Sequence, residues 1–522
     1  MMSFKLTYST MYNPPAEMHR RFDEALATVR ADLGRRHGLY IDGGDVMGES
    51  FISKYSPADT DLLLGHFSEA SADDAVRAVA AARAAYPAWR ALPMRERLAL
   101  LRRAAALIEE RVYLLSAAVA LEVGKNRMEA LGEVQETADF FVCYCNDFEA
   151  HNGFDKVLPD DPLEDWRSHN RSVMRPHGVW AVITPFNYPF ALAGGPVAAA
   201  LVTGNTVVLK GATDTPWAGR LLAECLHDAG IPAGVFNYVC GGAVVGSALV
   251  EHPHIGGVTF TGSYAVGMEI MRKLASRHYP RPCIAEMGGK NACIVTAAAD
   301  LERAASGIAR SAFGMGGQKC SALSRLYVHE SVADELIGRL RAEIDAIRIG
   351  DPCVRENWLG PVVNERAYRR FVDCATRLAA DGGRVYAGGE QLRSAALARG
   401  YYVQPTLAEL PREHALWREE MFLPILTVAR TRDNADAMTL ANASDFGLTA
   451  GFYGSAAEVD WFHENIEAGV TYANRPQGAT TGAWPGYQPF GGWKGSGSTG
   501  KAIASFYYLP QYLREQSRTV VE

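Results

Sequence analysis

A cysteine that follows a glycine-rich stretch is the residue with the clearest potential for chemistry. Residues 313–323 read FGMGGQKCSAL and place Cys320 after three glycines, a glutamine and Lys319. A backbone of this kind passes close to a ligand and presents the thiol at a tight corner. Since a free thiol ionises only near about pH 8.5, backbone N–H groups and Lys319 are expected to stabilise the thiolate. The alternative is a small buried hydrophobic residue, the usual role of a free cysteine.

Two further stretches carry groups that a thiol nucleophile needs. Glu286 opens EMGGKN after an apolar approach and places a lone carboxylate at the edge of a glycine turn. Asn187 lies in TPFNYP, between two prolines that stiffen the loop after the apolar run 179–183. A thiolate, a carboxylate and an amide donor are the nucleophile, general base and oxyanion partner of acyl chemistry. The three stretches together favour an enzyme over a structural protein or a binding module.

Alternating strands and helices are expected to position these groups. Short β-branched runs alternate with helical patterns from residue 179 to 274, and the alternation begins again after Glu286. Such βαβ units predict parallel, doubly wound sheets, which bind ligands at the carboxyl ends of their strands. Residues 16–38 are expected to be a surface helix without chemistry, followed by a strand at 39–41, and residues 73–150 a helical scaffold. The apolar run 507–509 is expected to be an edge strand, open to pairing with another subunit.

The fold class predicted is therefore α/β, with two doubly wound parallel-sheet lobes and a small β arm. Residues 1–150 and 172–287 are assigned to a dinucleotide-binding domain, and residues 288–480 to a catalytic domain with the thiol. Residues 151–171 and 481–522 are assigned to the substrate loop and an oligomerisation arm.

Composition limits the classes of function. The chain has 522 residues, a net charge of −7 and 48% hydrophobic residues, so we expect a globular enzyme rather than a protein that binds nucleic acid or an anionic membrane. No apolar run approaches the ~18 residues of a membrane span, and the first residues lack a signal peptide's pattern. The nine cysteines include no CxxC pair, and we expect no metal site and a reduced, cytoplasmic protein.

Two strand ends carry groups suited to a nucleotide. Lys210 follows the run Val207–Leu209, and Gly262 and Ser263 open the helix 265–274. The first N–H groups of that helix and its dipole favour a phosphate. A simple helix cap and a surface lysine are the alternative.

With these stretches in place, the chain resembles the NAD(P)-dependent aldehyde dehydrogenases from about residue 40 to 497. The motifs GQKCSA, EMGGKN, PFNYP, EEMFLP and PFGGWKGSG occur in that family's order. The resemblance implies that Cys320 is the nucleophile, Glu286 the general base and Asn187 the oxyanion amide. It implies an NAD or NADP cofactor, held by Ile183, Thr184, Pro185, Lys210, Thr213, Gly262, Ser263, Glu420 and Phe422.

Within the family, the chain is most similar to the subgroup that oxidises L-glutamate γ-semialdehyde, an enzyme of proline catabolism. The similarity lies in QKCSA, LEVGKN and the TGA ahead of QPFGG. It implies that the substrate is held by Ser321, Gly482, Ala483 and Phe490. Two features depart from the family: Leu423 stands in place of a usual Gly, and residues 483–487 are bulkier than expected. Thr213 stands where NAD-preferring members often carry Glu, so NADP is expected to be accepted as well as NAD.

The function implied is oxidation of an aldehyde to a carboxylic acid through a cysteine hemithioacetal and thioester. Other aliphatic or aromatic aldehydes or semialdehydes remain as alternative substrates. A CoA-acylating reductase is a third reading, which Glu286 disfavours because relatives of that kind generally lack a base there. The implied partners are a small-molecule aldehyde and further copies of the chain, as a homodimer or a dimer of dimers.

Overall fold

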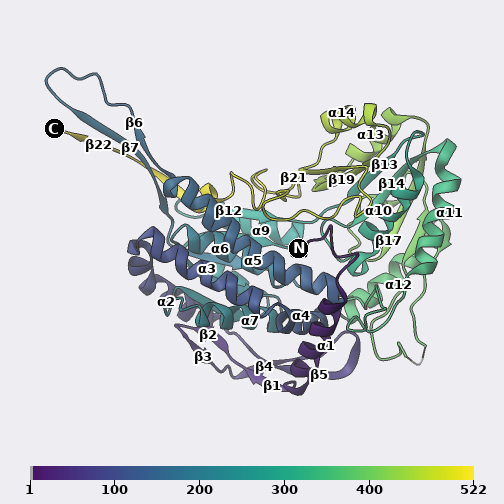
Figure 1. Cartoon of the computed structure of the whole chain (residues 1–522), viewed down its shortest axis with the longest axis horizontal. Coiled ribbons are helices and arrows are strands. Elements are labelled where there is room, and N and C mark those ends of the chain that lie inside the picture. The colour runs from purple at the N-terminus through teal and green to yellow at the C-terminus, as the bar shows by residue number, and fades with distance from the viewer. Residues whose placement is uncertain (1–3, 395) are drawn as a thin grey trace.

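The structure is a computed structural model that describes residues 4–394 and 396–522. Two lobes, each built on a seven-stranded sheet, lie side by side, and a thin arm projects from one of them (Figure 1). The predicted fold class is confirmed. None of the helices in the described residues combines the length and apolar character that crossing a membrane requires.

The first lobe contains a mostly parallel sheet with the strand order β12-β11-β8-β9-β10-β2-β3, in which β2 and β3 form an antiparallel hairpin at one edge. Its strands are β2 (Leu39–Ile41), β3 (Gly44–Val46), β8 (Val179–Ile183), β9 (Thr206–Gly211), β10 (Phe236–Cys240), β11 (Ile255–Thr261) and β12 (Cys283–Glu286). All five residues of β8 are buried, as expected where helices cover both faces of a sheet. Trp180 and Val182 enter one core, whereas Val179 and Ala181 enter the other.

Helices cover this sheet on both faces. One face carries α2 (Ala72–Ala91), α8 (Ala243–Glu251) and α9 (Tyr264–Ala275). The other face carries α1 (Ala16–Ala31), α3 (Met94–Glu110), α4 (Val112–Val123), α5 (Arg127–Ala150), α6 (Ala191–Val202) and α7 (Pro216–Asp228). Asn126 caps α5 by accepting hydrogen bonds from two backbone N–H groups, so the helix begins directly after Lys125.

The second lobe has the strand order β15-β16-β17-β14-β13-β19-β20, parallel throughout except for the β15–β16 pair. Its strands are β13 (Asn291–Val295), β14 (Leu323–His329), β15 (Arg384–Ala387), β16 (Thr406–Glu409), β17 (Ile425–Thr431), β19 (Thr449–Tyr453) and β20 (Val470–Ala473). Its helices are α10 (Leu301–Phe313), α11 (Glu330–Ala346), α12 (Glu365–Ala380), α13 (Asn434–Asn442) and α14 (Ala456–Asn465).

Smaller elements complete the described chain. The arm is an antiparallel sheet of β6 (Asp155–Leu158), β7 (Ser168–Pro176) and β22 (Leu513–Val521), with β7 in the middle. Two small sheets are formed by β1 (Arg35–His37), β4 (Ser50–Ser56) and β5 (Asp59–Glu69), and by β18 (Phe446–Gly447) and β21 (Trp493–Lys494). Short 3-10 turns are η1 (Asn152–Phe154), η2 (Gly314–Gly317), η3 (Ala415–Trp417) and η4 (Leu509–Tyr512).

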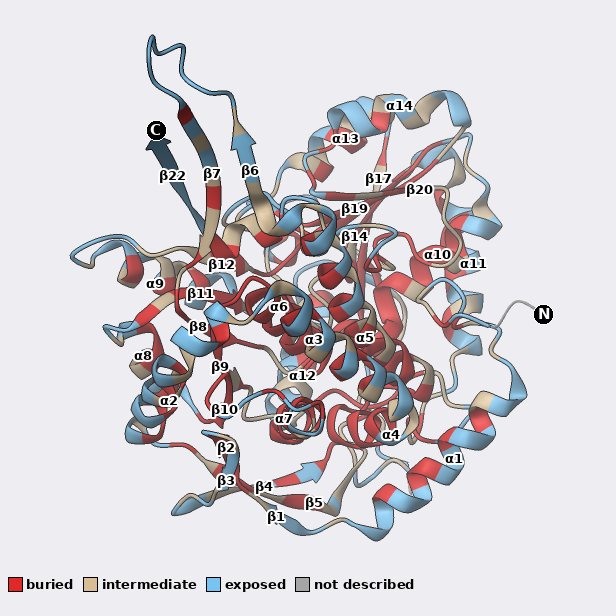
Figure 2. Ribbon diagram, turned by 60° about the vertical axis from the view of Figure 1, so that its left-hand side comes forward, coloured by how far each residue is buried: buried red, intermediate tan, exposed pale blue. Residues whose placement is uncertain are grey.

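The boundary predicted between residues 171 and 172 falls inside β7, which pairs with β22 along its whole length, and the division into domains stays a prediction. The prediction of an edge strand at 507–509 is wrong, since Tyr508 and Leu509 are buried in the core of the first lobe. The edge strand is β22, which is exposed along its whole length apart from Leu513 (Figure 2).

Candidate active site

The Cys320 turn lies between η2 and β14, at the edge of the second lobe that faces the first. A Cβ at Gly317 would lie 2.2 Å from the carbonyl oxygen of Leu423, so only glycine fits that close approach. The Asn291 side chain fixes the turn by donating to the carbonyl oxygens of Cys320 (2.7 Å) and Ala322 (2.8 Å). The glycines and the asparagine therefore hold the thiol in one position.

Asn187 and Glu286 lie at the carboxyl ends of β8 and β12 in the first lobe. Asn187 lines the same cavity as Cys320, and its Nδ2 donates to the carbonyl oxygen of Gln318 at 3.0 Å. Glu286 is the last residue of β12, where it bridges Gly497. The outer oxygens Asn187 Oδ1 and Glu286 Oε2 are both buried without a hydrogen-bond partner among the described residues. Unpaired buried polar atoms are costly, which is typical of groups reserved for a ligand or a reaction.

Burial raises the pKa of both groups that are predicted to react. Burial raises the pKa of the Cys320 thiol to about 12, and the carboxyl groups of Glu420 and Glu286 act in the same direction. Burial likewise raises the pKa of Glu286 well above its ordinary value. The expectation that Lys319 stabilises the thiolate is not met, because its Nζ donates to Glu129 at 2.9 Å. Burial therefore disfavours the charged form of both groups before substrate arrives.

Four carboxyl groups of helix α5 form hydrogen bonds with four different segments around Cys320. They lie three or four residues apart and so share one face of the helix. Three accept a hydrogen bond from a segment distant in sequence: Glu129 from Lys319 (2.9 Å), Glu136 from Tyr8 (2.7 Å) and Asp139 from Trp484 (2.7 Å). Glu133 accepts from Lys125 (2.5 Å), which lies just before the helix. Sequence reasoning assigned this region only to scaffold, although the spacing of its acidic residues was a signal available there.

The pair of Lys125 and Glu133 supports the Asn187 loop directly. Both side chains are completely buried, and Lys125 Nζ also donates to the backbone carbonyl of Asn187 at 2.8 Å. The other oxygen of Glu133 accepts from the backbone N–H groups of Phe190 (2.8 Å) and Ala191 (3.2 Å). The start of α6 and the asparagine loop are thus attached to α5 by a single buried ion pair.

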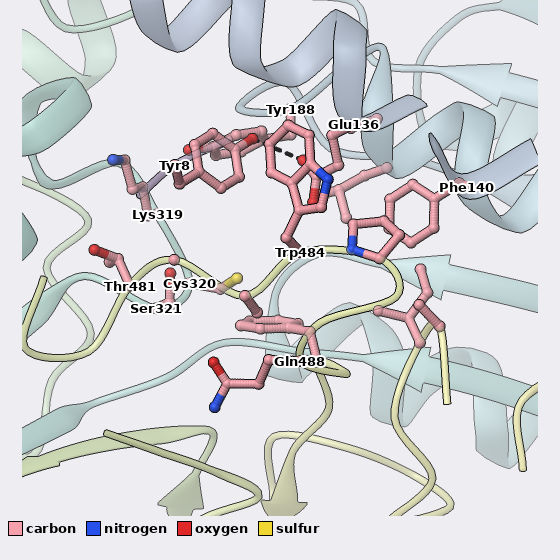
Figure 3. Close-up of a pocket in the computed structure, with 18 of the residues that line it drawn as sticks. Tyr8, Glu136, Phe140, Tyr188, Lys319, Cys320, Ser321, Thr481, Trp484 and Gln488 are labelled. Carbon is pink, nitrogen blue, oxygen red and sulfur yellow. Dashed lines mark hydrogen bonds between the residues drawn. The ribbon is translucent and has the colours of Figure 1, made fainter. Parts of the chain in front are cut away.

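A cavity on one side of Cys320 contains all the predicted substrate-binding residues. Ser321, Gly482, Ala483 and Phe490 line it together with Cys320. Figure 3 shows the sulfur of Cys320 near the centre, with the rings of Tyr8 and Trp484 above it and Gln488 below it. Residues that sequence reasoning did not place here also line the cavity: Tyr8, Met11, Tyr12, Glu136, Phe140, Tyr188, Lys319 and Trp484.

Two connected cavities on the other side of Cys320 contain most of the predicted cofactor residues. The cavity next to the thiol, of about 410 Å³, is lined by Asn187, Glu420 and Phe422. The outer one, of about 310 Å³, is lined by Ile183, Thr184 and Lys210. Both are lined by Pro185, Gly262 and Ser263, the last of which immediately precedes α9. Thr213, which lies within the described residues, lines neither of them.

These cavities have features that suit a dinucleotide. The α9 N-terminus offers backbone N–H groups to a phosphate at the point where the two cavities meet. Glu420 is held in place by the N–H of Gly289 (2.8 Å), and a Cβ at Gly288 would collide with its carboxylate. Among the described residues, no group of three His, Cys, Asp or Glu side chains is arranged to hold a metal ion.

Comparisons with known proteins give a consistent result. The profile of the aldehyde dehydrogenase family matches residues 45–517. The chain is 38% identical over 510 residues to 1-pyrroline-5-carboxylate dehydrogenase 1 of Halalkalibacterium halodurans, with 96% of each chain covered. It is 35% identical over 509 residues to the 1-pyrroline-5-carboxylate dehydrogenase of Bacillus subtilis, again with 96% of each covered. Among solved structures, the 1-pyrroline-5-carboxylate dehydrogenase from Thermus with bound NAD superimposes with a TM-score of 0.91 at 32% identity, covering 100% of this chain and 99% of that one.

Proposed function

Because the chain belongs to the aldehyde dehydrogenase family, we propose that it oxidises L-glutamate γ-semialdehyde to glutamate with NAD or NADP as the electron acceptor. The observation that carries this proposal is the cavity in which Ser321, Gly482 and Ala483 surround Cys320. Backbone N–H groups and a hydroxyl suit the carboxylate and ammonium of an amino-acid head. Relatives named for 1-pyrroline-5-carboxylate, the cyclic form of this semialdehyde, support the same substrate.

The first step is addition of the Cys320 sulfur to the aldehyde carbon. The thiol gives its proton to solvent water as the carbon–sulfur bond forms, and the carbonyl oxygen gains negative charge. The Asn187 amide and the backbone N–H of Cys320 stabilise that oxyanion. Since Asn187 Nδ2 donates to Gln318 in the free protein, substrate binding exchanges this hydrogen bond for one to the oxyanion. The buried Lys125–Glu133 pair keeps the asparagine loop in place during the exchange.

The second half of the reaction releases the acid. A nicotinamide held beside Glu420 and Phe422 would supply the hydride acceptor, and loss of a hydride from the substrate carbon leaves a thioester on Cys320. Glu286 then takes a proton from a water molecule that attacks the thioester carbon. It returns this proton to the departing sulfur, and the thiol forms again. The unpaired Oε2 of Glu286 is the acceptor for that proton. Burial raises the pKa of Glu286, and this makes its carboxylate a stronger acceptor for a proton from water.

The cofactor assignment follows from the two connected cavities. Gly262 and Ser263 would hold the pyrophosphate, Lys210 the adenosine ribose, and Glu420 with Phe422 the nicotinamide side. Ile183, Thr184 and Pro185 would form the wall of the adenosine side. Thr213 carries no negative charge against a 2′-phosphate, so we propose that NADP is accepted as well as NAD. A preference for NAD above about a hundredfold in kcat/KM would contradict this part.

The test is steady-state formation of NADH and NADPH with 1-pyrroline-5-carboxylate beside aliphatic, aromatic and other semialdehyde substrates. Cys320→Ala provides the blank. We expect 1-pyrroline-5-carboxylate to exceed the other substrates by at least about a hundredfold in kcat/KM. If another aldehyde leads, the proposed substrate is wrong although the reaction class stands. If no substrate exceeds the blank, the proposed reaction fails.

One observation favours a second substrate class. Trp484 and Phe140 give the cavity an aromatic wall, which suits an apolar aldehyde better than a charged head. The aromatic aldehydes in the same panel test this alternative.

We also propose a homodimer or dimer of dimers in the cytoplasm. The projecting arm with its open edge strand supports assembly of several chains. All nine cysteines are free thiols, and a thiol nucleophile works in a reducing compartment.

A further inference from the structure

The N-terminal segment forms part of the wall of the substrate cavity. Residues 5–12, here called the N-terminal strap, precede α1, and Tyr8, Met11 and Tyr12 of this strap line the cavity. The strap belongs to no helix or strand, and its sequence KLTYSTMY carries no recognisable chemistry. Because the strap lies far from Cys320 in sequence, the contact is a purely tertiary one.

Hydrogen bonds tie the strap to the loop that carries the substrate residues. Arg475 donates to Ser9 Oγ at 2.8 Å and also to the carbonyl oxygen of Thr481, the residue before Gly482. The Tyr12 hydroxyl donates to the carbonyl oxygen of Gln477 at 3.2 Å. The guanidinium of Arg310 also lies over the Tyr12 ring, 3.9 Å from its centroid. Strap and loop are therefore positioned together.

Helix α5 holds the other side of the strap. The Tyr8 hydroxyl donates to Glu136 at 2.7 Å, and Lys5 forms an ion pair with Asp139 at 3.1 Å. Gly132 leaves room for the tyrosine ring, because a Cβ there would lie 3.0 Å from Tyr8 Cε1. Tyr8 is thus held at its hydroxyl and along one edge of its ring.

The two aromatic rings above Cys320 pack against each other. The centroids of Tyr8 and Trp484 are 5.0 Å apart at an interplanar angle of 76°, an edge-to-face contact (Figure 3). Trp484 is fixed in turn by its bond to Asp139 at 2.7 Å. The free space left in the cavity is about 90 Å³, against about 410 Å³ in the cavity on the other side of the thiol. A long substrate chain therefore meets a rigid wall.

We propose that the strap, through Tyr8 and Tyr12 packed with the Trp484 loop, determines substrate specificity by limiting the length of the aldehyde that reaches Cys320. The class accepted is short aldehydes, including a five-carbon semialdehyde with a polar head, and the class excluded is long-chain aldehydes. This goes beyond the proposed function but rests on it in one respect, because the aldehyde must enter from the cavity that Tyr8 lines.

The kinetic test compares straight-chain aldehydes from propanal to decanal in wild type, Tyr8→Ala, Tyr12→Ala and Tyr8→Phe. In Tyr8→Ala and Tyr12→Ala, kcat/KM for decanal relative to propanal should rise about tenfold or more. Tyr8→Phe retains the ring and should keep the wild-type ratio. An unchanged ratio in both alanine variants, each folded by its thermal midpoint, overturns the proposal. Since only ratios between aldehydes are compared, the result is independent of whether 1-pyrroline-5-carboxylate leads the substrate panel.

A second measurement needs no turnover. Iodoacetamide and its bulky N-pyrenyl analogue are compared for alkylation of Cys320, followed by peptide mass mapping to exclude the other thiols. The reagent can also reach Cys320 from the cofactor side, and that route is the same in every variant. A difference in alkylation rate between variants therefore measures the effect of the strap. In Tyr8→Ala, the ratio of the Cys320 alkylation rate with the bulky reagent to that with iodoacetamide should rise about tenfold over wild type. If the alkylation rate rises equally for both reagents, the strap does not restrict the size of the molecule that reaches Cys320. The proposal then fails even if every variant is inactive with aldehydes.

Discussion

Desolvation raises the pKa of the half-buried Cys320 thiol to about 12, and the carboxyl groups of Glu420 and Glu286 act in the same direction. A thiol reacts as the thiolate, so its alkylation rate follows the thiolate fraction. We predict that without cofactor the iodoacetamide rate at Cys320 rises about tenfold per pH unit from neutral pH to about pH 10 without levelling. The rate is measured by mass mapping of the Cys320 peptide over time. A plateau near neutral pH would mean that the free enzyme already holds a thiolate.

Glu286 gives a prediction for the second half of the reaction. Glu286→Gln keeps the shape of the side chain but cannot take a proton from water, so the thioester should accumulate on Cys320. We expect a rapid burst of reduced cofactor followed by steady turnover slowed about a hundredfold or more. Stopped-flow absorbance and intact mass measure the burst and the adduct. Steady turnover equal to wild type would remove Glu286 from the role of general base.

In the wild type, the same carboxyl group predicts a pH dependence. Its pKa is raised by burial, and the base must be ionised, so deacylation should increase with pH through a range above that of an ordinary carboxyl group. This rise is measured as kcat against pH, under conditions where thioester hydrolysis limits turnover. A kcat that is constant from about pH 5 upward contradicts the prediction.

Local sequence could single out reactive residues but not their long-range partners. Cys320, Glu286 and Asn187 stand out because each sits beside glycine or proline in a context unsuited to a core, and their roles remain predictions. Lys319 illustrates the limit. Its adjacency to the thiol favoured a role in activation, but its partner is Glu129, 190 residues away. Pairing over such a distance leaves no trace in the local pattern.

At the scale of elements, α5 connects the segments around the thiol. Lys125→Met leaves Glu133 as a buried charge without its partner and frees the carbonyl of Asn187. Losing one member of a buried pair costs about 3–5 kcal/mol of unfolding free energy. We predict that loss in urea unfolding, together with a fall in kcat larger than the change in KM. Arg102→Met, which removes an exposed partner of Glu149 on the same helix, should cost at most about 1 kcal/mol. Equal losses in the two variants would argue against a special role of the buried pair.

Elements were predictable where burial imposes a pattern. The strands of both lobes are short apolar runs between glycines, since helices cover both faces of each sheet. The edge strand β22 was missed because its sequence LREQSRTVV is exposed on both faces and so has no alternation of apolar residues. The apolar run at 507–509 was mistaken for it, whereas Tyr508 and Leu509 of that run are buried in the core that α5 also enters. The strap was missed for a similar reason, as its contacts lie only in tertiary structure.

At the scale of the whole molecule, the arm is the part whose exposed apolar surface a single chain does not explain. It extends away from both lobes, yet it carries exposed apolar side chains, with Val157 at 74% and Val520 at 56% of full exposure (Figure 1). Exposed apolar groups on the edge strands of a projecting sheet are typical of an interface. This favours assembly through the arm over assembly through either lobe.

The corresponding prediction concerns oligomeric state. Wild type should be a dimer or larger by light scattering at micromolar concentration, and the double variant Val157→Glu/Val520→Glu should dissociate at least about tenfold more readily, because two charges would be buried at the interface. Val76→Glu places the same charge on the exposed face of α2, away from the arm, and should leave the assembly unchanged. Since the arm lies apart from Cys320 and its cavities, a dissociated variant that keeps kcat/KM would show that each subunit contains a complete site. A monomeric wild type, or a double variant as stable as Val76→Glu, would exclude the arm as the interface.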